Sequence, residues 1–120
     1  MATILALDDV TDAAILIKRI LGKKGHDVFA FTEEEDALKF AETHEVDLAV
    51  LDIKLKKING LEVLKELKKI NPSMRAIMLT GYPTLEAARE SLKLGASEFC
   101  VKPIDKEELE EKVASVLEGS

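Results

Sequence analysis

The sequence predicts one α/β domain in which a parallel β-sheet is covered by helices on both faces. Three observations support this class. Five short apolar runs alternate strictly with five stretches of helical periodicity, in the order βαβαβαβαβα. Most of the runs are almost continuously apolar, as expected of parallel strands buried on both faces. The length of 120 residues suits a single domain with a core of its own.

The first predicted strand covers residues 3–8, a short apolar run. Apolar residues then recur at helical spacing from Val10 to Leu21. Gly22 and Gly25 follow this stretch and are expected to end the helix, because glycine is common just beyond helix carboxyl ends.

The second predicted strand covers residues 27–32. A helix is expected over 33–44, with Thr32 as its amino-terminal cap and acidic residues in its first turn, where they complement the helix dipole. Residues 47–52 form the next apolar run, which predicts a fully buried strand.

The third helix is indicated by Leu61, Leu64 and Leu67, and it should end before Pro72, since the residue before a proline disfavours helix. The apolar run at 75–80 predicts another buried strand.

The last three elements are a helix over 84–95 that ends in a glycine, a strand over 97–102, and a final helix. The apolar face of that final helix is marked by Leu109, Val113, Val116 and Leu117.

Composition narrows the function classes. A net charge of -6 and a pI near 5.0 argue against unaided binding to nucleic acid or anionic membranes. No apolar run is long enough to span a membrane, no signal peptide is visible, and a single cysteine, Cys100, suits a reducing cytoplasm. Cys100 is expected to be a core residue. His26 and His44 fit no metal-ligand spacing and are expected at the surface.

Polar residues collect where the predicted strands end. Asp8 and Asp9 follow the first strand, Asp52 ends the third, Thr80 the fourth and Lys102 the fifth. The carboxyl ends of parallel strands share one edge of the sheet, which is where ligands bind in such folds. Three close carboxylates need neutralising, and Mg²⁺ accepts such oxygen ligands while leaving room for a phosphate. A carboxylate, a hard cation, a lysine and a hydroxyl are the groups needed for phosphoryl transfer to an aspartate.

Each of these residues also has a simpler interpretation. The Asp8–Asp9 pair could cap the first helix, and Asp52 or Thr80 could be turn residues. Lys102 alone could be a solvated lysine. The simpler interpretation requires all of them to meet at one sheet edge by accident, and this favours a functional site.

Four stretches, "LALDDV", "LAVLDIKL", "IMLTGY" and "GASEFCVKP", together resemble the receiver domain of bacterial two-component response regulators. The resemblance covers essentially the whole chain. It implies a flavodoxin-like (βα)5 fold, a doubly wound sheet of strand order 2-1-3-4-5 with helices on both faces. It also implies a receiver domain over residues 1–118, with residues 119–120 as a tail or an artificial remnant.

The resemblance implies a role for each site residue. Asp52 would be the phosphoacceptor. Asp8, Asp9 and Asp52, with the backbone carbonyl of Lys54, would hold Mg²⁺ or Mn²⁺. The cation, rather than the protein alone, would then balance the clustered carboxylates.

Other residues would handle the phosphoryl group and the signal. Lys102 would pair with the phosphoryl group, and the Lys102–Pro103 peptide would be cis. Thr80 would donate a hydrogen bond to a phosphoryl oxygen, and Phe99 stands at the position of the switch aromatic residue.

The resemblance also implies that two further residues border the approach of the hydrolytic water. Lys54 and Tyr82 each lie two positions beyond a site residue. Both are large, and neither has a carboxylate or amide to orient a water. They are therefore expected to prolong the life of the phosphorylated form.

The sequence departs from the receiver pattern at three positions. Lys56 stands where a proline is usual, Lys57 where a small residue often follows, and Val10 where a third acid is frequent. These departures concern the stiffness of the loop after Asp52 and the partner surface, and leave all five site positions intact.

The function implied is that of a signalling switch rather than an enzyme, although the domain would assist its own phosphotransfer and autodephosphorylation. A sensor histidine kinase or a phosphotransfer protein would supply the phosphoryl group from a phosphohistidine. The changed face would be residues 84–118, acting on an output domain or partner protein. A phosphorylation-dependent dimer is compatible with this role, whereas direct contact with nucleic acid or membrane is not expected.

Three other functions are possible for this fold, and the sequence argues against each of them. A haloacid-dehalogenase type hydrolase needs a second acid two residues after its aspartate nucleophile, where this chain has Lys54. A flavin carrier needs a Ser/Thr/Gly-rich phosphate loop after the first strand, where this chain has the acidic "DDVTDA". A receiver-like assembly module without phosphorylation would not need the five intact site residues.

Overall fold

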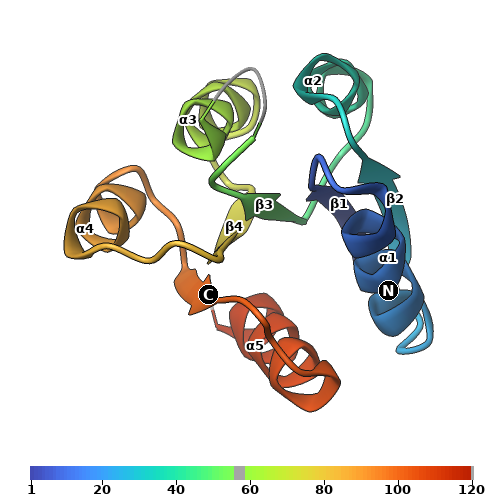
Figure 1. Ribbon diagram of the computed structural model, residues 1–120. Helices are drawn as coiled ribbons and strands as arrows, with labels where there is room; N and C mark the ends of the chain where they lie inside the picture. The colour runs from blue at the N-terminus through green and yellow to red at the C-terminus, as the bar shows by residue number, and fades with distance from the viewer. Residues whose placement is uncertain (56–58, 120) are drawn as a thin grey trace.

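Five parallel strands lie in the spatial order β2-β1-β3-β4-β5 in the computed structural model, which describes residues 1–55 and 59–119 (Figure 1). Strands and helices alternate along the chain, as the sequence predicts. The elements are β1 (Thr3–Leu7), α1 (Thr11–Gly22), β2 (Asp27–Phe31), α2 (Glu34–Thr43), β3 (Leu48–Asp52), α3 (Gly60–Ile70), β4 (Arg75–Thr80), α4 (Leu85–Lys93), β5 (Glu98–Val101) and α5 (Lys106–Glu118).

Helices cover both faces of the sheet. Helices α1 and α5 lie on one face, and α2, α3 and α4 on the other (Figure 1). Side chains alternate between the two faces along each strand. In β1, Ile4 and Ala6 pack into the core beneath α1 and α5, while Leu5 and Leu7 pack beneath α2 and α3. The flavodoxin-like (βα)5 fold and its strand order are therefore confirmed.

Element ends differ from the sequence predictions by at most two residues, as at the end of α4, which was predicted at residue 95 and lies at Lys93. The predicted cap of α2, Thr32, lies one position too early. Glu33 is the cap residue and makes no capping hydrogen bond through its side chain. Gly22 lies inside α1, and the left-handed backbone conformation occurs three residues later, at Gly25 (φ 92°). Glycine alone adopts that conformation without strain.

Cys100 is buried, as predicted, and so are Met74 and Met78. The two histidines differ from each other. His44 is exposed, as expected, and stacks on a phenylalanine ring. His26 is half-buried rather than a surface residue, and its Nδ1 atom is buried without a hydrogen-bond partner in the described part of the chain.

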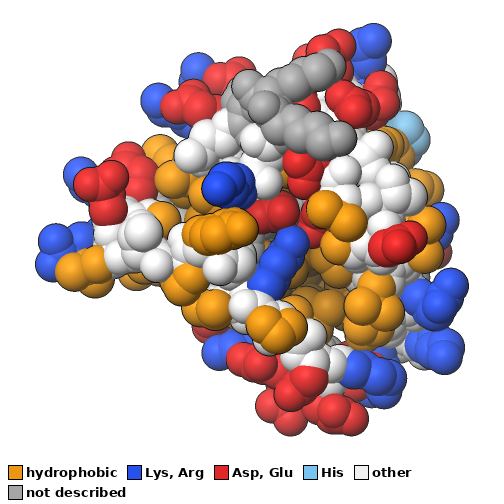
Figure 2. Space-filling view, in the orientation of Figure 1, with side chains coloured by type: hydrophobic (Ala, Val, Ile, Leu, Met, Phe, Trp, Pro, Cys, Tyr) orange, Lys and Arg blue, Asp and Glu red, His pale blue; other side chains and the backbone are white. Residues whose placement is uncertain are grey.

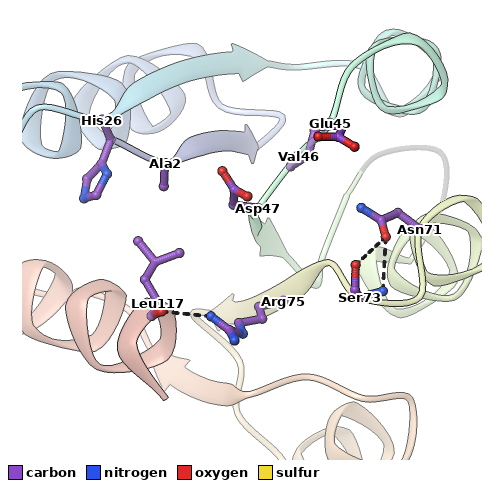
Figure 3. Close-up of a pocket in the computed structure, with 9 residues that line it drawn as sticks. All are labelled: Ala2, His26, Glu45, Val46, Asp47, Asn71, Ser73, Arg75 and Leu117. Atoms are coloured by element: carbon purple, nitrogen blue, oxygen red, sulfur yellow. Dashed lines mark hydrogen bonds between the residues drawn. The ribbon is translucent and has the colours of Figure 1, made fainter. Parts of the chain in front are cut away.

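A hollow of about 510 Å³ lies at the amino-terminal edge of the sheet (Figure 3). Two of the charged groups on its wall are hydrogen-bonded to main-chain atoms. Asp47 accepts a hydrogen bond from the Thr3 N–H at 2.8 Å, and Arg75 donates to the Leu117 carbonyl at 2.9 Å. The bond from Arg75 to Leu117 therefore ties the end of α5 to β4 at this hollow.

No helix within residues 1–55 and 59–119 is long and apolar enough to cross a bilayer.

Candidate functional site

The carboxyl ends of β1 and β3 bring three acidic side chains together. These strands are neighbours, so Asp8 and Asp52 lie side by side, and Asp9 follows directly. Carboxylate oxygens of Asp8, Asp9 and Asp52 lie within 4.8 Å of one another. Asp8 is only 1% exposed and Asp52 only 7%, so two of these charges are largely removed from water. Burying carboxylates this close together is unfavourable without positive charge nearby.

Lys102 supplies that positive charge from the end of β5. Its Nζ donates to Asp8 Oδ2 at 2.6 Å and to Asp52 Oδ2 at 3.1 Å. The Lys102 N–H donates to the Thr80 carbonyl at 2.8 Å, which fixes the lysine at the neighbouring strand. The Lys102–Pro103 peptide is cis, as the sequence comparison predicted. Three acids and a lysine predicted from three strand ends thus form one cluster, with Thr80 joined to it through its backbone carbonyl.

Tight turns hold the side-chain oxygens of Asp8, Asp52 and Thr80 in place. In each turn a side-chain oxygen accepts a hydrogen bond from the backbone N–H two residues later, the arrangement of Asx and ST turns. The turn interpretation of Asp52 and Thr80 is therefore confirmed, and their functional role stays a prediction. The bonds run from Val10 to Asp8 (2.9 Å), from Lys54 to Asp52 (3.2 Å) and from Tyr82 to Thr80 (3.0 Å).

Capping does not explain the acidic pair. The cap of α1 is Val10, and α1 has no side-chain cap hydrogen bond. Asp8 and Asp9 therefore precede the helix without serving as its cap.

Burial and charge pull the pKa of Asp52 in opposite directions. Desolvation raises it most strongly; the hydrogen bond and charge of Lys102 lower it, the charge of Asp8 raises it and the Lys54 N–H lowers it. The net effect is a pKa above the ordinary 3.8. For Lys102, burial lowers the pKa, but hydrogen bonds and charge from Asp8 and Asp52 outweigh it, and the net pKa is raised. The lysine is held in its charged form.

The Asn59–Gly60 pair explains how α3 begins next to Asp52. The Gly60 N–H donates to the Ile53 carbonyl at 2.6 Å, and Asn59 caps α3 by accepting from the Leu61 N–H at 2.7 Å. A Cβ atom on Gly60 would lie 2.0 Å from the Asp52 carbonyl oxygen. Only glycine fits there. Sequence analysis missed this support for Asp52, and the only signal was a glycine soon after a strand-end acid.

Lys54 and Tyr82 pair with each other above the site. The Lys54 Nζ lies 4.2 Å from the centroid of the Tyr82 ring, a cation–π contact. The ring is 70% exposed. Both residues line a groove of about 480 Å³ between the start of α3 and α4, which also reaches Thr80. The lysine arm is therefore held over the tyrosine ring by a contact that was not foreseen from the sequence.

Phe99 lies on β5, opposite Met78 of β4, and is partly buried against the core beneath α2, α3 and α4. Thr80 is 1% exposed and lies two residues further along β4. Lys56 and Lys57, the unusual pair in the loop after Asp52, lie outside the described residues.

The donor set suits a hard divalent cation. Three carboxylates converge within reach of a single ion, and oxygen ligands of this type are those that Mg²⁺ and Mn²⁺ take in proteins. In this structure Lys102 balances two of these carboxylates.

Comparison with protein families gives one match, and it covers most of the chain. Residues 4–114 match the model of the response regulator receiver domain. The chain belongs to this family. Receiver domains are signal-transduction modules of two-component systems, and the resemblance seen in the sequence is confirmed.

Curated relatives differ in length. This receiver is 33% identical over 114 residues to sporulation initiation phosphotransferase F of Bacillus subtilis, covering 95% of this chain and 92% of that protein. It is 35% identical over 117 residues to the alkaline phosphatase synthesis transcriptional regulatory protein PhoP of the same organism, covering 98% of this chain but 49% of that protein. The chain thus matches a relative of its own length and about half of a longer regulator.

Solved structures agree with the fold. A CheY-like receiver domain from Methanospirillum hungatei superposes with a TM-score of 0.94 at 35% identity, covering 98% of this receiver and 94% of that chain. A Burkholderia pseudomallei response regulator described as having a phosphorylated aspartic acid and a calcium ion superposes with a TM-score of 0.87 at 26% identity, covering 98% and 66%.

Proposed function

We propose that this receiver accepts a phosphoryl group on Asp52 from a phosphohistidine of a sensor kinase or phosphotransfer protein. One observation carries the proposal. The end of β3 presents a buried carboxylate, that of Asp52, within hydrogen-bond reach of Lys102 and within 4.8 Å of two further carboxylates. No simple structural role needs three acids and a lysine in one buried cluster.

The transfer of the phosphoryl group to Asp52 would be a displacement at phosphorus. An oxygen of the Asp52 carboxylate donates an electron pair to phosphorus, and the phosphorus–nitrogen bond of the donor breaks. The bonding pair returns to the imidazole nitrogen, which takes up a proton. Lys102 would form an ion pair with the transferred phosphoryl group. The Thr80 oxygen accepts a hydrogen bond from the Tyr82 N–H, so the hydroxyl hydrogen remains available to donate to a phosphoryl oxygen.

A divalent cation would be held by Asp8, Asp9, Asp52 and the backbone carbonyl of Lys54. Mg²⁺ or Mn²⁺ in that position supplies charge neutralisation for the phosphoryl oxygens. With the carboxylate charge balanced in this way, Lys102 would be less strongly paired with Asp8 and Asp52 and could pair with the phosphoryl group.

The output of the switch would pass through Thr80 and Phe99 to α4, β5 and α5, residues 84–118. We further propose that residues 1–118 form the receiver unit, that it works in the cytoplasm and that it loses the phosphoryl group through its own hydrolysis. The PhoP relative supports transmission of the signal to an output domain or partner, because this chain matches only about half of that transcriptional regulatory protein.

The test is phosphorylation by acetyl phosphate with Mg²⁺, read as a mass increase of one phosphoryl group. The parent protein should be labelled, Asp52→Asn should not, and removal of Mg²⁺ by a chelator should abolish labelling. Asp36→Asn removes an exposed acid elsewhere and serves as the matched control. Labelling of Asp52→Asn at the parent rate would refute Asp52 as the acceptor. An unlabelled parent that still binds partners would favour an assembly module instead.

A further inference from the structure

Three of the four phenylalanines lie together at the outer edge of the sheet, far from β5. The ring centroids of Phe29 on β2 and Phe40 on α2 are 4.6 Å apart, and those of Phe31 and Phe40 are 5.4 Å apart. The ring of His44 stacks on Phe40 at 4.0 Å. Phe29 is 40% exposed. These four rings, here called the β2 aromatic patch, adjoin one another, unlike the scattered apolar residues found on any protein surface.

The same segment carries the chain's entire excess of negative charge. Residues 27–45 contain seven acidic residues and one lysine, whereas the rest of the chain contains sixteen acidic and sixteen basic residues. The segment therefore holds a formal charge of -6 and the remainder is balanced. Asp36 and Glu42 line the same shallow hollow as Phe31 and Phe40, and Lys39, the one lysine of the segment, lies among them. Acidic side chains gather over α2 in Figure 2, with hydrophobic side chains beside them.

The strand beneath the patch is an edge strand. Within the sheet β2 pairs with β1. The Asp27 N–H donates to the Ala2 carbonyl at 3.0 Å, toward β1. Backbone groups of alternate residues in a strand point to the same side, so Phe29 also bonds toward β1 while Val28 and Ala30 direct their N–H and C=O groups to the open edge. An open edge can pair with an extended segment.

We propose that β2 and the β2 aromatic patch dock an extended, lysine- or arginine-rich segment of a partner protein. Main-chain groups of the segment pair with Val28 and Ala30. Its cationic side chains lie over the exposed ring of Phe29 and pair with Asp36 and Glu42. A second copy of this chain fits poorly, because a two-fold contact would set the same acidic residues against each other.

The probe is a synthetic peptide of alternating lysine and valine, seven residues long with blocked ends, added to the full chain in the presence of Mg²⁺. Backbone amide shifts report where it binds. We expect saturable shifts within residues 27–45 and weaker binding as salt rises. A matched peptide of alternating glutamate and valine should cause none.

Two double variants with equal charge change test the location. Asp36→Asn with Glu42→Gln should raise the Kd of the lysine peptide about fivefold, since each exposed pair contributes a fraction of a kcal/mol. Glu107→Gln with Glu111→Gln, exposed on α5, removes the same charge and should leave Kd nearly unchanged. Phe29→Ser should weaken binding further, with Leu92→Ser on α4 as its exposed apolar control.

Three results would overturn the proposal. One is the absence of saturable binding. Another is binding that maps to the cluster around Asp52, or that both charge variants weaken equally. The third is a dimer in sedimentation that Phe29→Ser dissolves, which would make a second copy the occupant. None of these results bears on phosphorylation, which the Asp52→Asn labelling tests separately.

Discussion

Asp52 is a carboxylate that its surroundings make harder to ionise. Burial raises its pKa more than Lys102 lowers it, and Asp8 adds repulsion. The folded protein therefore binds a proton at Asp52 more readily than the unfolded chain does. Its contribution to stability is present at pH values below the ordinary 3.8 and is lost as pH rises through the higher pKa of the folded state.

Asp52→Asn should accordingly stabilise the fold at neutral pH without metal, because it removes a desolvated charge while Lys102 keeps Asp8 as a partner. We expect the free energy of unfolding to rise by about 1 kcal/mol at pH 7, and the gain to shrink as pH falls. Denaturant unfolding in a chelator at several pH values measures this. Glu111→Gln controls for net charge. A variant less stable than the parent at pH 7 would show that the Lys102 contact outweighs burial.

Lys54 and Tyr82 should govern how long a phosphoryl group stays on Asp52. Hydrolysis needs a water in line with the bond that breaks, and the paired side chains cover the groove beside Thr80. Lys54→Asn with Tyr82→Glu opens this approach and offers groups that orient a water. The lifetime should shorten roughly tenfold, about 1.4 kcal/mol in the barrier.

The measurement is the decay of phosphorylated protein after the phosphodonor is removed, at constant Mg²⁺. Leu85→Asn, exposed at the start of α4, is a control outside the lysine–tyrosine pair. Unchanged decay in the double variant would show that these side chains do not limit access of water.

Single elements are positioned by close backbone contacts as well as by packing. The start of α3 presses on the end of β3 at Gly60, where an added Cβ would meet the Asp52 carbonyl oxygen. Gly60→Ala should cost about 2–3 kcal/mol through overpacking. It should also shift amide signals around Asp52.

Gly22→Ala is the matched control, because Gly22 also lies in a helix and an added Cβ there meets nothing within 4 Å. That change should be neutral or stabilising by up to about 1 kcal/mol, from helix propensity. Thermal unfolding of both variants decides the point. Equal stabilities would mean that α3 relaxes away from β3 at no cost.

Strands were predictable where burial is continuous along the run, and less so where a strand is only partly covered. The runs that became β3 and β4 are buried on both faces, and their strand ends followed within a residue. Edge strand β2 is only partly covered, and neither the ring cluster of Phe29 nor its contact with Phe40 follows from spacing. The start of α2 was misjudged because a threonine before three glutamates is a good cap signal, whereas Glu33 occupies that position without a capping bond.

Within the site, residue identities were predictable and their contacts were not. Parallel topology alone brings Asp8, Asp52 and Lys102 to one edge. Two contacts could not be predicted: Lys102 binds the carboxylates of both Asp8 and Asp52, and Lys54 lies over the ring of Tyr82. Each depends on separations of a few ångströms between side chains that are far apart in the sequence.

At the scale of the whole molecule, the two faces of the sheet should respond unequally to phosphorylation. Thr80 and Lys102 come from β4 and β5, and Phe99 packs beneath the helix layer that contains α4. α4 is weakly anchored, with Ser91 as its single buried residue. A phosphoryl mimic such as beryllofluoride shifts the balance of conformations only by its differential affinity for them.

Beryllofluoride with Mg²⁺ should therefore shift amide signals of residues 84–118 well beyond the immediate site, and those of α1 and α2 much less. Thr80→Ala should bind the mimic yet lose most of the distant shifts. Distant shifts confined to α1 and α2, or unaffected by Thr80→Ala, would contradict this route.

The hollow at the amino-terminal edge has a practical consequence for handling the protein. Ala2 and Leu117, each near one end of the chain, line the same hollow (Figure 3). Strands of five residues, about 17 Å long, separate it from the acidic cluster. A tether or a fluorophore attached at Met1 or Gly119, which are close in sequence to Ala2 and Leu117, is thus expected on the side away from Asp52. The rate of phosphorylation by acetyl phosphate should be the same for protein immobilised through either residue and for protein in free solution.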